Sequence, residues 1–133
     1  MQPYFFFLLF LFSVVNSNAQ FIQSTDTINA PNTIAQVWVK PMYHDSMASS
    51  FVIVIPVEVK LHKHLTHAEH VYVLEGAGEM VLGDKKFLVK KGDLIFIPRG
   101  TLHSVRVTSI SPMKVLSVQA PYFDGKDRVA VQE

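Results

Sequence analysis

The amino-acid sequence predicts an all-β protein, either a sandwich or a barrel of short strands. Beyond residue 33, runs of β-branched, aliphatic and aromatic residues recur at short intervals, and glycine and proline separate them. No convincing helical period of apolar residues is found in this part of the chain. Many short strands separated by turn residues are typical of these two architectures.

The first nineteen residues are expected to be a secretory signal peptide. The chain from Tyr4 to Val15 is almost wholly apolar, and Asn16 to Ala19 form a small-residue cleavage site before Gln20. The apolar run is shorter than the roughly 20 residues that a membrane-spanning helix needs, so no stable membrane anchor is expected. One departure is that no Lys or Arg precedes the run. The sequence therefore predicts a secreted or periplasmic protein.

The remaining chain is expected to form an N-terminal arm at residues 20–33 and one barrel domain at residues 34–133. Its length is usual for a single domain with its own core. The formal net charge is +1 and no basic stripe is present, so a nucleic-acid partner is not expected. The chain contains no cysteine, which excludes disulfides.

Two prolines shape the strands expected at the start of this domain. The first strand is expected over residues 33–41, where Pro41 ends it. The next and longest run is 51–59, and its Pro56 suggests an edge position or a bulge because proline cannot donate to a strand ladder.

Glu58 and Lys60 follow Pro56, and they are weak candidates for catalytic residues. If strand alternation continues past the proline, both face the interior with His62 and His64, and the valines between them face outward. Two charged groups in an apolar barrel are costly unless they pair or meet a ligand. The alternatives are a solvated barrel mouth or a bulge that reverses the alternation.

Three histidines and one glutamate form a candidate metal site. His62 and His64 are two residues apart, so an extended strand directs both imidazoles to one face. Glu69 begins the next expected strand, which ends at Gly76. His103 comes much later, after a turn, and a barrel brings such distant strands together. Imidazole and carboxylate ligands suit iron, manganese, zinc, nickel and copper.

Other polar residues near these segments have different expected positions. His67 is expected in a solvated turn, and His70 is expected to face outward because it alternates with Glu69. His44 could lie at the barrel mouth, within reach of a substrate. Arg99 lies in the turn before His103 and could reach an anionic substrate at the rim.

Two segments of the chain resemble the conserved motifs of the cupin superfamily. The first motif, G-x5-H-x-H-x(3,4)-E-x6-G, is matched at His62, His64, Glu69 and Gly76, with Pro56 in place of the leading glycine. The second motif is G-x5-P-x-G-x2-H-x3-N. It is matched at Gly92, Pro98, Gly100 and His103, and Val107 stands where asparagine is usual. Between the motifs, Gly83 and Asp84 indicate a hairpin. The resemblance is to a small single-domain cupin and covers roughly residues 34–131.

This resemblance implies a double-stranded β-helix, or jelly-roll, barrel that binds one divalent transition metal. Iron or manganese is favoured, with zinc, nickel or copper as alternatives. The resemblance also implies a homodimer, the usual assembly in the family. A metal with open positions implies an enzyme acting on a small organic substrate, with dioxygenase-like chemistry first and isomerase or lyase chemistry as alternatives. From a different class, a non-catalytic module that binds a sugar or other small molecule fits the same residues.

Overall fold

The computed structural model describes residues 21–131. The predicted signal peptide at 1–19 therefore lies outside the described residues. Within the described part, no helix is long and apolar enough to cross a membrane. The one helical element there is a short 3-10 turn, η1 (Thr25–Thr27), and the remaining elements are strands.

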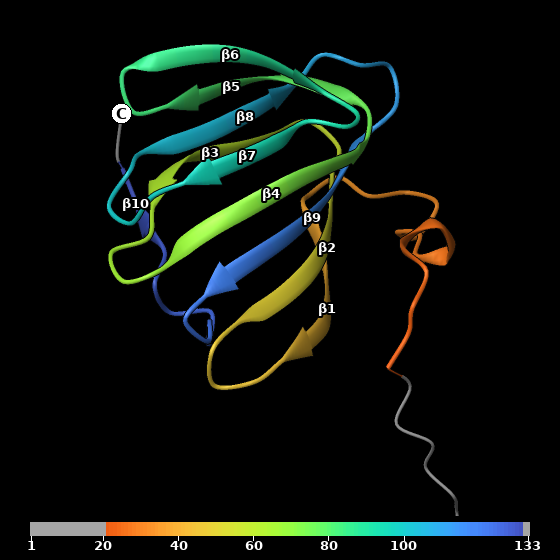
Figure 1. The fold of residues 1–133 in the computed structure, drawn as a ribbon. Helices are drawn as coiled ribbons and strands as arrows, with labels where there is room; N and C mark the ends of the chain where they lie inside the picture. Colours follow the sequence, from red (N-terminus) through yellow and green to blue (C-terminus); the bar gives the residue numbers. More distant parts are fainter. Residues whose placement is uncertain (1–20, 132–133) are drawn as a thin grey trace, which may run out of the picture.

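Within residues 21–131, ten strands form two antiparallel sheets that face each other (Figure 1). The first sheet has the order β1 (Trp38–His44), β2 (Ser49–Ile55), β9 (Met113–Ala120), β4 (Ala68–Glu75) and β7 (Leu94–Ile97). The second has the order β10 (Val129–Ala130), β3 (Glu58–Lys63), β8 (His103–Val107), β5 (Ala77–Leu82) and β6 (Lys85–Lys90). This is the jelly-roll fold that the sequence predicts.

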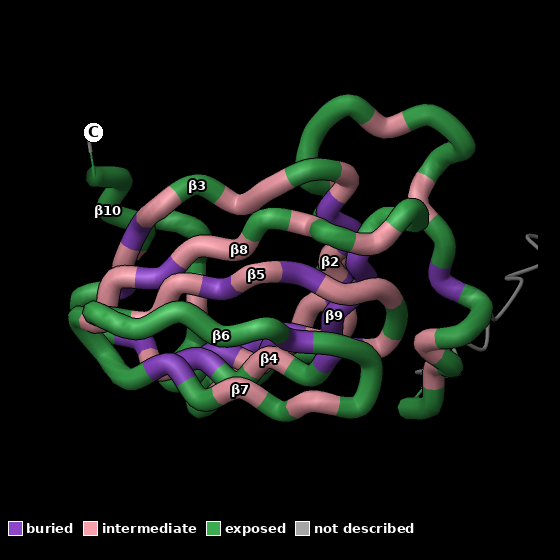
Figure 2. Tube along the Cα trace, turned by 90° about the horizontal axis from the view of Figure 1, so that it is seen from above, coloured by how far each residue is buried: buried purple, intermediate pink, exposed green. Residues whose placement is uncertain are grey.

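The apolar core lies between the sheets. Buried segments alternate with half-buried ones along strands such as β5, because successive side chains point to opposite faces (Figure 2). The core cluster consists of seven buried residues: Ile55, Val73, Met80, Val89, Ile97, Met113 and Val115. Val105 and Val107 of β8 pack against it.

The expected strand over residues 51–59 is broken in the structure. β2 ends at Ile55, and β3 begins at Glu58 in the other sheet. Pro56 lies at the corner between them, where its missing N–H removes no bond from a ladder. The prediction of one continuous strand is therefore wrong, because the proline marks a change of sheet.

The expected end of the first strand is also wrong. β1 begins at Trp38 and continues through Pro41 to His44. It is the edge strand of its sheet, and its register against β2 shifts after Pro41. An edge strand with a bulge tolerates proline because that residue needs no ladder partner.

Two glycines end strands as the sequence predicts. Gly83 has a φ of 61° in the hairpin between β5 and β6, and Gly76 has a φ of 81° directly after β4. A Cβ at Gly76 would lie 2.9 Å from the Cα of Met113. Only glycine fits this turn without strain, because L side chains rarely adopt such a φ.

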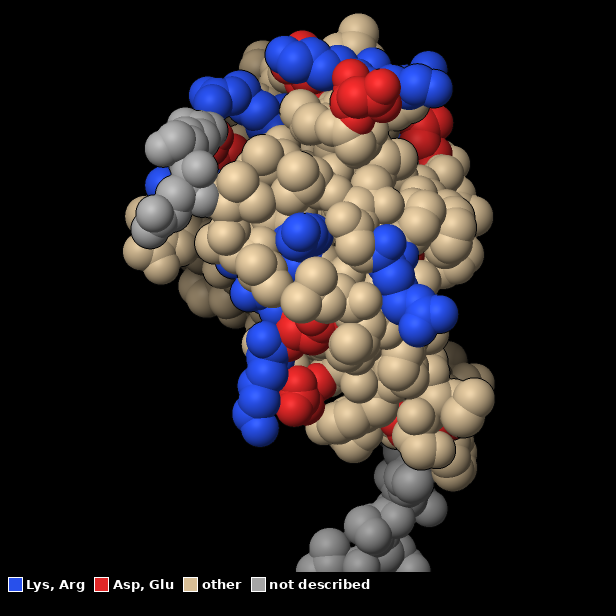
Figure 3. Space-filling view, turned by 90° about the vertical axis from the view of Figure 1, so that its left-hand side faces the viewer, with Lys and Arg blue, Asp and Glu red and all other residues tan. Residues whose placement is uncertain are grey.

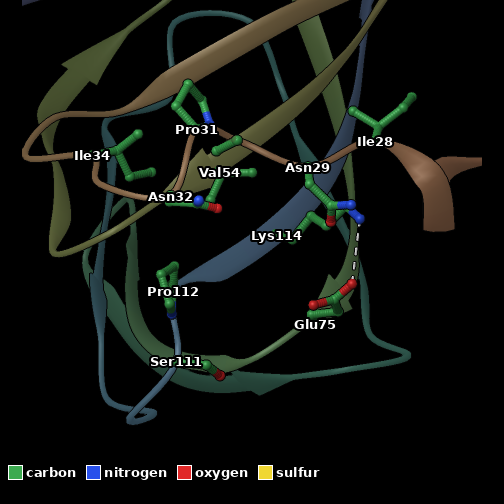
Figure 4. Close-up of a pocket in the computed structure, with 11 residues that line it drawn as sticks. Ile28, Asn29, Pro31, Asn32, Ile34, Val54, Glu75, Ser111, Pro112 and Lys114 are labelled. Carbon is green, nitrogen blue, oxygen red and sulfur yellow. Dashed lines mark hydrogen bonds and ion pairs between the residues drawn. The ribbon is translucent and has the colours of Figure 1, made fainter.

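The segment before β1 lies against the outer face of the first sheet (Figure 4). Residues 28–32 and Ile34 line a hollow of about 240 Å³ together with Val54, Pro112 and Lys114. The Nζ of Lys114 is 3.3 Å from the Oε1 of Glu75. Because Lys114 alternates with the inward-facing Met113 and Val115, this hollow is on the opposite side of the sheet from the core.

Candidate metal centre

Three histidines converge between the two sheets. His62 lies in β3, His64 directly follows that strand, and His103 begins β8, where it pairs in register with His62. Their candidate ligand atoms all lie within 4.8 Å of one another. The three residues are 4–5% exposed, so the cluster is shielded from solvent.

Backbone carbonyl groups fix the ring orientation of each histidine in this cluster. The Nδ1 of His62 donates to Lys60 O at 2.8 Å, and the Nδ1 of His103 donates to Thr101 O at 2.9 Å. The Nδ1 of His64 donates to Asp127 O. A neutral imidazole that donates from Nδ1 carries its free lone pair on Nε2, which leaves three Nε2 atoms available as ligands.

Glu69 of β4 adds a carboxylate to the same cluster. Its Oε2 lies 3.7 Å from His64 Nε2 and 3.5 Å from His103 Nε2. Its Oε1 accepts a hydrogen bond from Ser117 Oγ at 2.5 Å. Burial raises the pKa of Glu69, but the contacts with His103 and Ser117 outweigh it, and the pKa lies below its ordinary value. The carboxylate is therefore ionised.

This donor set fits a divalent transition metal. Lone pairs on imidazole nitrogen and the Glu69 carboxylate face one another, an arrangement that a shared cation stabilises. Among the described residues, the buried Nε2 of His103 has no hydrogen-bond partner, and metal coordination would satisfy it. All four residues that the sequence predicts as ligands are brought together. Nitrogen and oxygen donors of this kind are compatible with several metals and do not select one.

The pKa of His62 is compatible with metal binding by this residue. The pKa falls from 6.5 to about 4, chiefly through burial and with help from the nearby His103, Arg128 and His64, while the hydrogen bond to Lys60 opposes the shift. The neutral form is therefore favoured well below pH 6.5. Because a histidine must be neutral to bind a metal, His62 is ready to bind without losing a proton.

His67 corrects one expectation from the sequence. It is 6% exposed, so the prediction of a solvated turn residue is wrong. Its Nδ1 lies 2.6 Å from Asp127 Oδ2, and its Nε2 lies 2.8 Å from Tyr122 O. The C-terminal segment covers the turn, a contact between residues distant in sequence. Burial lowers the pKa of His67, but its bonds to Asp127 and Tyr122 outweigh this and raise it.

His70 has the position that the sequence predicts. It is exposed, outside the histidine cluster, and its ring packs against that of Phe96 with the centroids 4.9 Å apart.

Glu58 and Lys60 do not face the interior with the histidines. The register between β3 and β8 shifts between Val59 and His62, so Val59 packs on the core cluster and His62 also points inward. Glu58 forms an ion pair with Arg106 at 3.0 Å, and Lys60 is exposed. The observed register shift agrees with one of the expected alternatives for these charges, a bulge that reverses the alternation of side chains.

Arg99 is exposed in the turn before β8. The next residue, Gly100, donates its N–H to His64 O at 2.6 Å. This backbone bond ties the turn to the histidine cluster.

A hollow of about 410 Å³ lies between β1, β2 and the C-terminal segment. Its wall includes Tyr43, Phe51 and Phe123, and none of its lining residues is Lys or Arg. The ring of Phe123 packs edge-on against His64, with centroids 5.5 Å apart, so it separates the hollow from the histidine cluster. His44 also lines the hollow, a position that agrees with the expected barrel mouth.

Two supporting residues were missed by the sequence analysis. Ser117 was detectable, because it is a polar residue in the same alternation as Met113 and Val115 of β9. Asp127 has no such signal, because it lies in an irregular segment far from the residues it contacts.

Surface charge gives no sign of a polyanion site on the face drawn in Figure 3. Basic and acidic side chains are interspersed there, with no continuous basic patch. A nucleic-acid site would present a basic patch or stripe.

Known proteins resemble the chain in sequence and in fold. Residues 51–119 match the sequence profile of a family described as "Cupin domain". An uncharacterized protein of Methanocaldococcus jannaschii is 43% identical over 76 residues, which is 56% of this chain and 61% of that protein. The chain thus matches less than two thirds of that relative's length.

Two solved structures show the same fold. A conserved protein of Klebsiella pneumoniae with a double-stranded β-helix domain has a TM-score of 0.71 at 21% identity, covering 84% of this chain and 97% of that chain. Pac13 from Streptomyces, a nucleoside dehydratase, has a TM-score of 0.60 at 18% identity, covering 71% and 85%. With the profile match over half of its length and the jelly-roll fold, the chain belongs to the cupin family.

Proposed function

We propose that this protein binds one divalent transition metal through His62, His64, Glu69 and His103 and is a metal-dependent enzyme acting on a small organic molecule. The observation that carries the proposal is the orientation of the three imidazoles. Each Nδ1 is bound to a carbonyl group, and each Nε2 is left for the shared centre beside an ionised carboxylate. Such support of the ligand rings is typical of metal centres.

Four protein ligands leave two positions open on a metal that accepts six. A bound metal would supply Lewis-acid or redox chemistry at this point. The proposal favours iron or manganese and dioxygenase-like chemistry, with zinc, nickel or copper and isomerase or lyase chemistry as alternatives. The dehydratase activity of Pac13 belongs to that protein, and at 18% identity it supports only the idea that this fold can host lyase chemistry.

The hollow beside Phe123 is the proposed place where a small organic molecule binds, next to the histidine cluster. Its volume of about 410 Å³ suits a small organic molecule. The chain's own residues contribute shielding here, since Phe123 covers His64 and keeps water away from that side of the cluster. Glu58, Lys60 and Arg99 lie outside the residues that line this hollow, which leaves them with little support as catalytic groups.

The alternative function is a non-catalytic cupin module that binds a sugar or another small molecule. The aromatic rings of Tyr43, Phe51 and Phe123 favour it, because they give the hollow surfaces on which a sugar or planar ring can stack. In this alternative the metal orients the ligand or has a structural role.

Elemental analysis tests the proposal. The protein is purified without chelator or affinity-tag metal, next to a His62→Ala/His64→Ala double variant and a His70→Ala control. Near-stoichiometric iron or manganese that is lost only in the double variant supports the enzyme and directs screening to dioxygen-consuming reactions. No bound metal, and none taken up on reconstitution, would contradict it and favour the binding module.

Export and dimerisation belong to the same proposal. Export rests on the apolar run and small-residue site within residues 4–19. Mass spectrometry of the mature protein tests it, and retention of the first nineteen residues contradicts it.

For a homodimer, Tyr72, Leu94 and Phe96 give an exposed apolar surface on β4 and β7. Light scattering of the purified protein measures the number of subunits.

A further inference from the structure

The C-terminal segment after β9 folds back over the turn that joins β3 to β4. Asp127 is the residue of this segment that makes the contacts. Its Oδ1 accepts the N–H of Leu65 at 2.8 Å, and its Oδ2 accepts the N–H groups of Thr66 and His67 at 2.8 and 3.1 Å. One carboxylate thus binds three successive backbone N–H groups, all between the ligands His64 and Glu69.

Two side chains complete this contact. Thr66 Oγ1 donates to Asp127 Oδ2 at 2.7 Å, and His67 Nδ1 lies 2.6 Å from the same oxygen. Bonds to an ionised acceptor are shorter and stronger than bonds between neutral groups. The carboxylate therefore holds the turn and the C-terminal segment together.

The backbone carbonyl of the same residue reaches the metal cluster. Asp127 O accepts the Nδ1–H of His64, a residue 63 positions earlier in the chain. The equivalent carbonyls for His62 and His103 come from residues two positions before them. Local chain geometry supports those two rings. His64 lies beyond the end of β3 and takes its support from a distant segment.

We propose that Asp127 is a positioning residue of the metal centre. Its carboxylate anchors the segment to the turn, and this anchoring places its carbonyl so that His64 is held as the Nδ1–H tautomer with Nε2 directed at the other ligands. The effect on metal binding rests on the proposed function. The effect on the His64 ring does not, because the ring is oriented by the protein alone.

The first test measures cobalt binding by Asp127→Ala and Asp127→Asn variants. The backbone carbonyl is present in both, so any effect on His64 comes from the lost anchoring. Replacing supporting groups of this kind typically weakens metal binding by about 10- to 100-fold. Competition with a chromophoric chelator should show a loss of that size for Asp127→Ala, with an altered visible spectrum of bound Co²⁺. Asp127→Asn keeps the size of the side chain and one acceptor oxygen, so it should fold and show a smaller loss in the same direction.

Asp45→Ala is the matched control. The Asp45 carboxylate also accepts two backbone N–H groups in a turn, from Met47 at 2.7 Å and Ala48 at 3.0 Å, but it lies in the β1–β2 turn and contacts no ligand. Its Co²⁺ affinity should stay within about twofold of the unaltered protein, and its spectrum should not change, since those bonds lie outside the support of the ligand rings. A loss of Co²⁺ affinity in this control as large as that in Asp127→Ala would overturn the proposal. The loss in the Asp127 variant would then be explained by general destabilisation of the protein.

The second test needs no metal. Imidazole ¹⁵N NMR of the metal-free protein should show His62, His64 and His103 as Nδ1–H tautomers, and only His64 should change in the Asp127 variants. Unchanged His64 signals and unchanged Co²⁺ affinity, with only a lower melting temperature, would overturn the positioning role. If the unaltered protein binds no Co²⁺ while the His64 signals still respond, the positioning of the ring holds and the proposed metal function fails.

Discussion

The two ends of the barrel interior are built from the same strands but have opposite chemistry. At one end, Val73 of β4, Val105 of β8 and Val115 of β9 belong to or pack against the apolar core. At the other end, the same three strands present Glu69, His103 and Ser117 to the interior. A few residues along each strand separate a packed core from a polar cluster.

The difference teaches how this barrel separates stability from binding. Burying apolar side chains is favourable by about 25 cal/mol per Å² removed from water. Burying acceptors such as the lone pair of His103 Nε2 is unfavourable unless they find a partner. We therefore expect changes at the apolar end to lower stability and changes at the polar end to lower metal affinity.

The largest expected effect comes from removing a ligand ring. His62→Ala should weaken metal binding by more than about 100-fold, beyond the loss typical of supporting groups, because one of the four donors is lost. The melting temperature of the metal-free protein should change little. Isothermal titration with Zn²⁺ or Co²⁺ and thermal unfolding measure the two quantities. His67→Ala and His70→Ala are the comparisons, and equal losses of affinity in all three variants would contradict the ligand assignment.

Acidification should affect the polar end next most strongly. The pKa of His62 falls to about 4 in the folded protein, below its value of about 6.5 in an unfolded chain. The unfolded chain therefore binds more protons between these values, and the metal-free protein should lose stability as the pH falls from about 6.5 to 4. The loss should be roughly 2–3 kcal/mol. Urea unfolding at a series of pH values measures it, and a His62→Ala variant that keeps the same pH dependence would contradict this origin.

At the apolar end, Val73→Ala should lower stability without changing metal affinity. Val73 is 0% exposed, and its truncation removes buried methyl groups and leaves a cavity. The expected loss is about 2 kcal/mol in the free energy of unfolding. Urea unfolding and metal titration of the same sample check both parts. A loss of metal affinity as large as the one in His62→Ala would show that the two ends are coupled.

The smallest expected effect comes from Ser117→Ala. This change removes the hydrogen bond to Glu69 Oε1 and leaves the second oxygen beside the histidines. The carboxylate loses an anchor worth about 1 kcal/mol, so metal affinity should fall several-fold. Metal titration measures the change, and Ser49→Ala, a buried serine of β2 that contacts no ligand, is its control. No difference between the two variants would mean that Ser117 does not orient Glu69.

Short-range sequence patterns predicted most of the strands and the four residues that converge between the sheets. The alternation within β4, the hairpin at Gly83 and the spacing of His62 and His64 are local properties. They depend on neighbouring residues and not on how distant segments pack. Prolines were harder to interpret. Pro41 continues an edge strand and Pro56 turns a corner, and the difference depends on the position of each strand in its sheet.

The bulge in β3 shows why the phase of side chains could not be predicted. Glu58 and His62 have the same parity in sequence, yet the register shift against β8 places Val59 and His62 on the same interior face. One extra residue reverses the alternation, and only the pairing with β8 fixes where that residue lies.

By itself, the sequence determined the all-β architecture and the four residues that meet between the sheets, because strand periodicity and motif spacing are carried by neighbouring residues. Tertiary structure alone decided the direction in which the pKa values of His67 and His62 move. Burial lowers the pKa of His67 but its bonds to Asp127 and Tyr122 outweigh this and raise it, whereas burial and the charges of nearby His103, Arg128 and His64 lower the pKa of His62. The physical reason is that a pKa depends on the charges and acceptors that surround a side chain in space, and here these come from the other end of the chain.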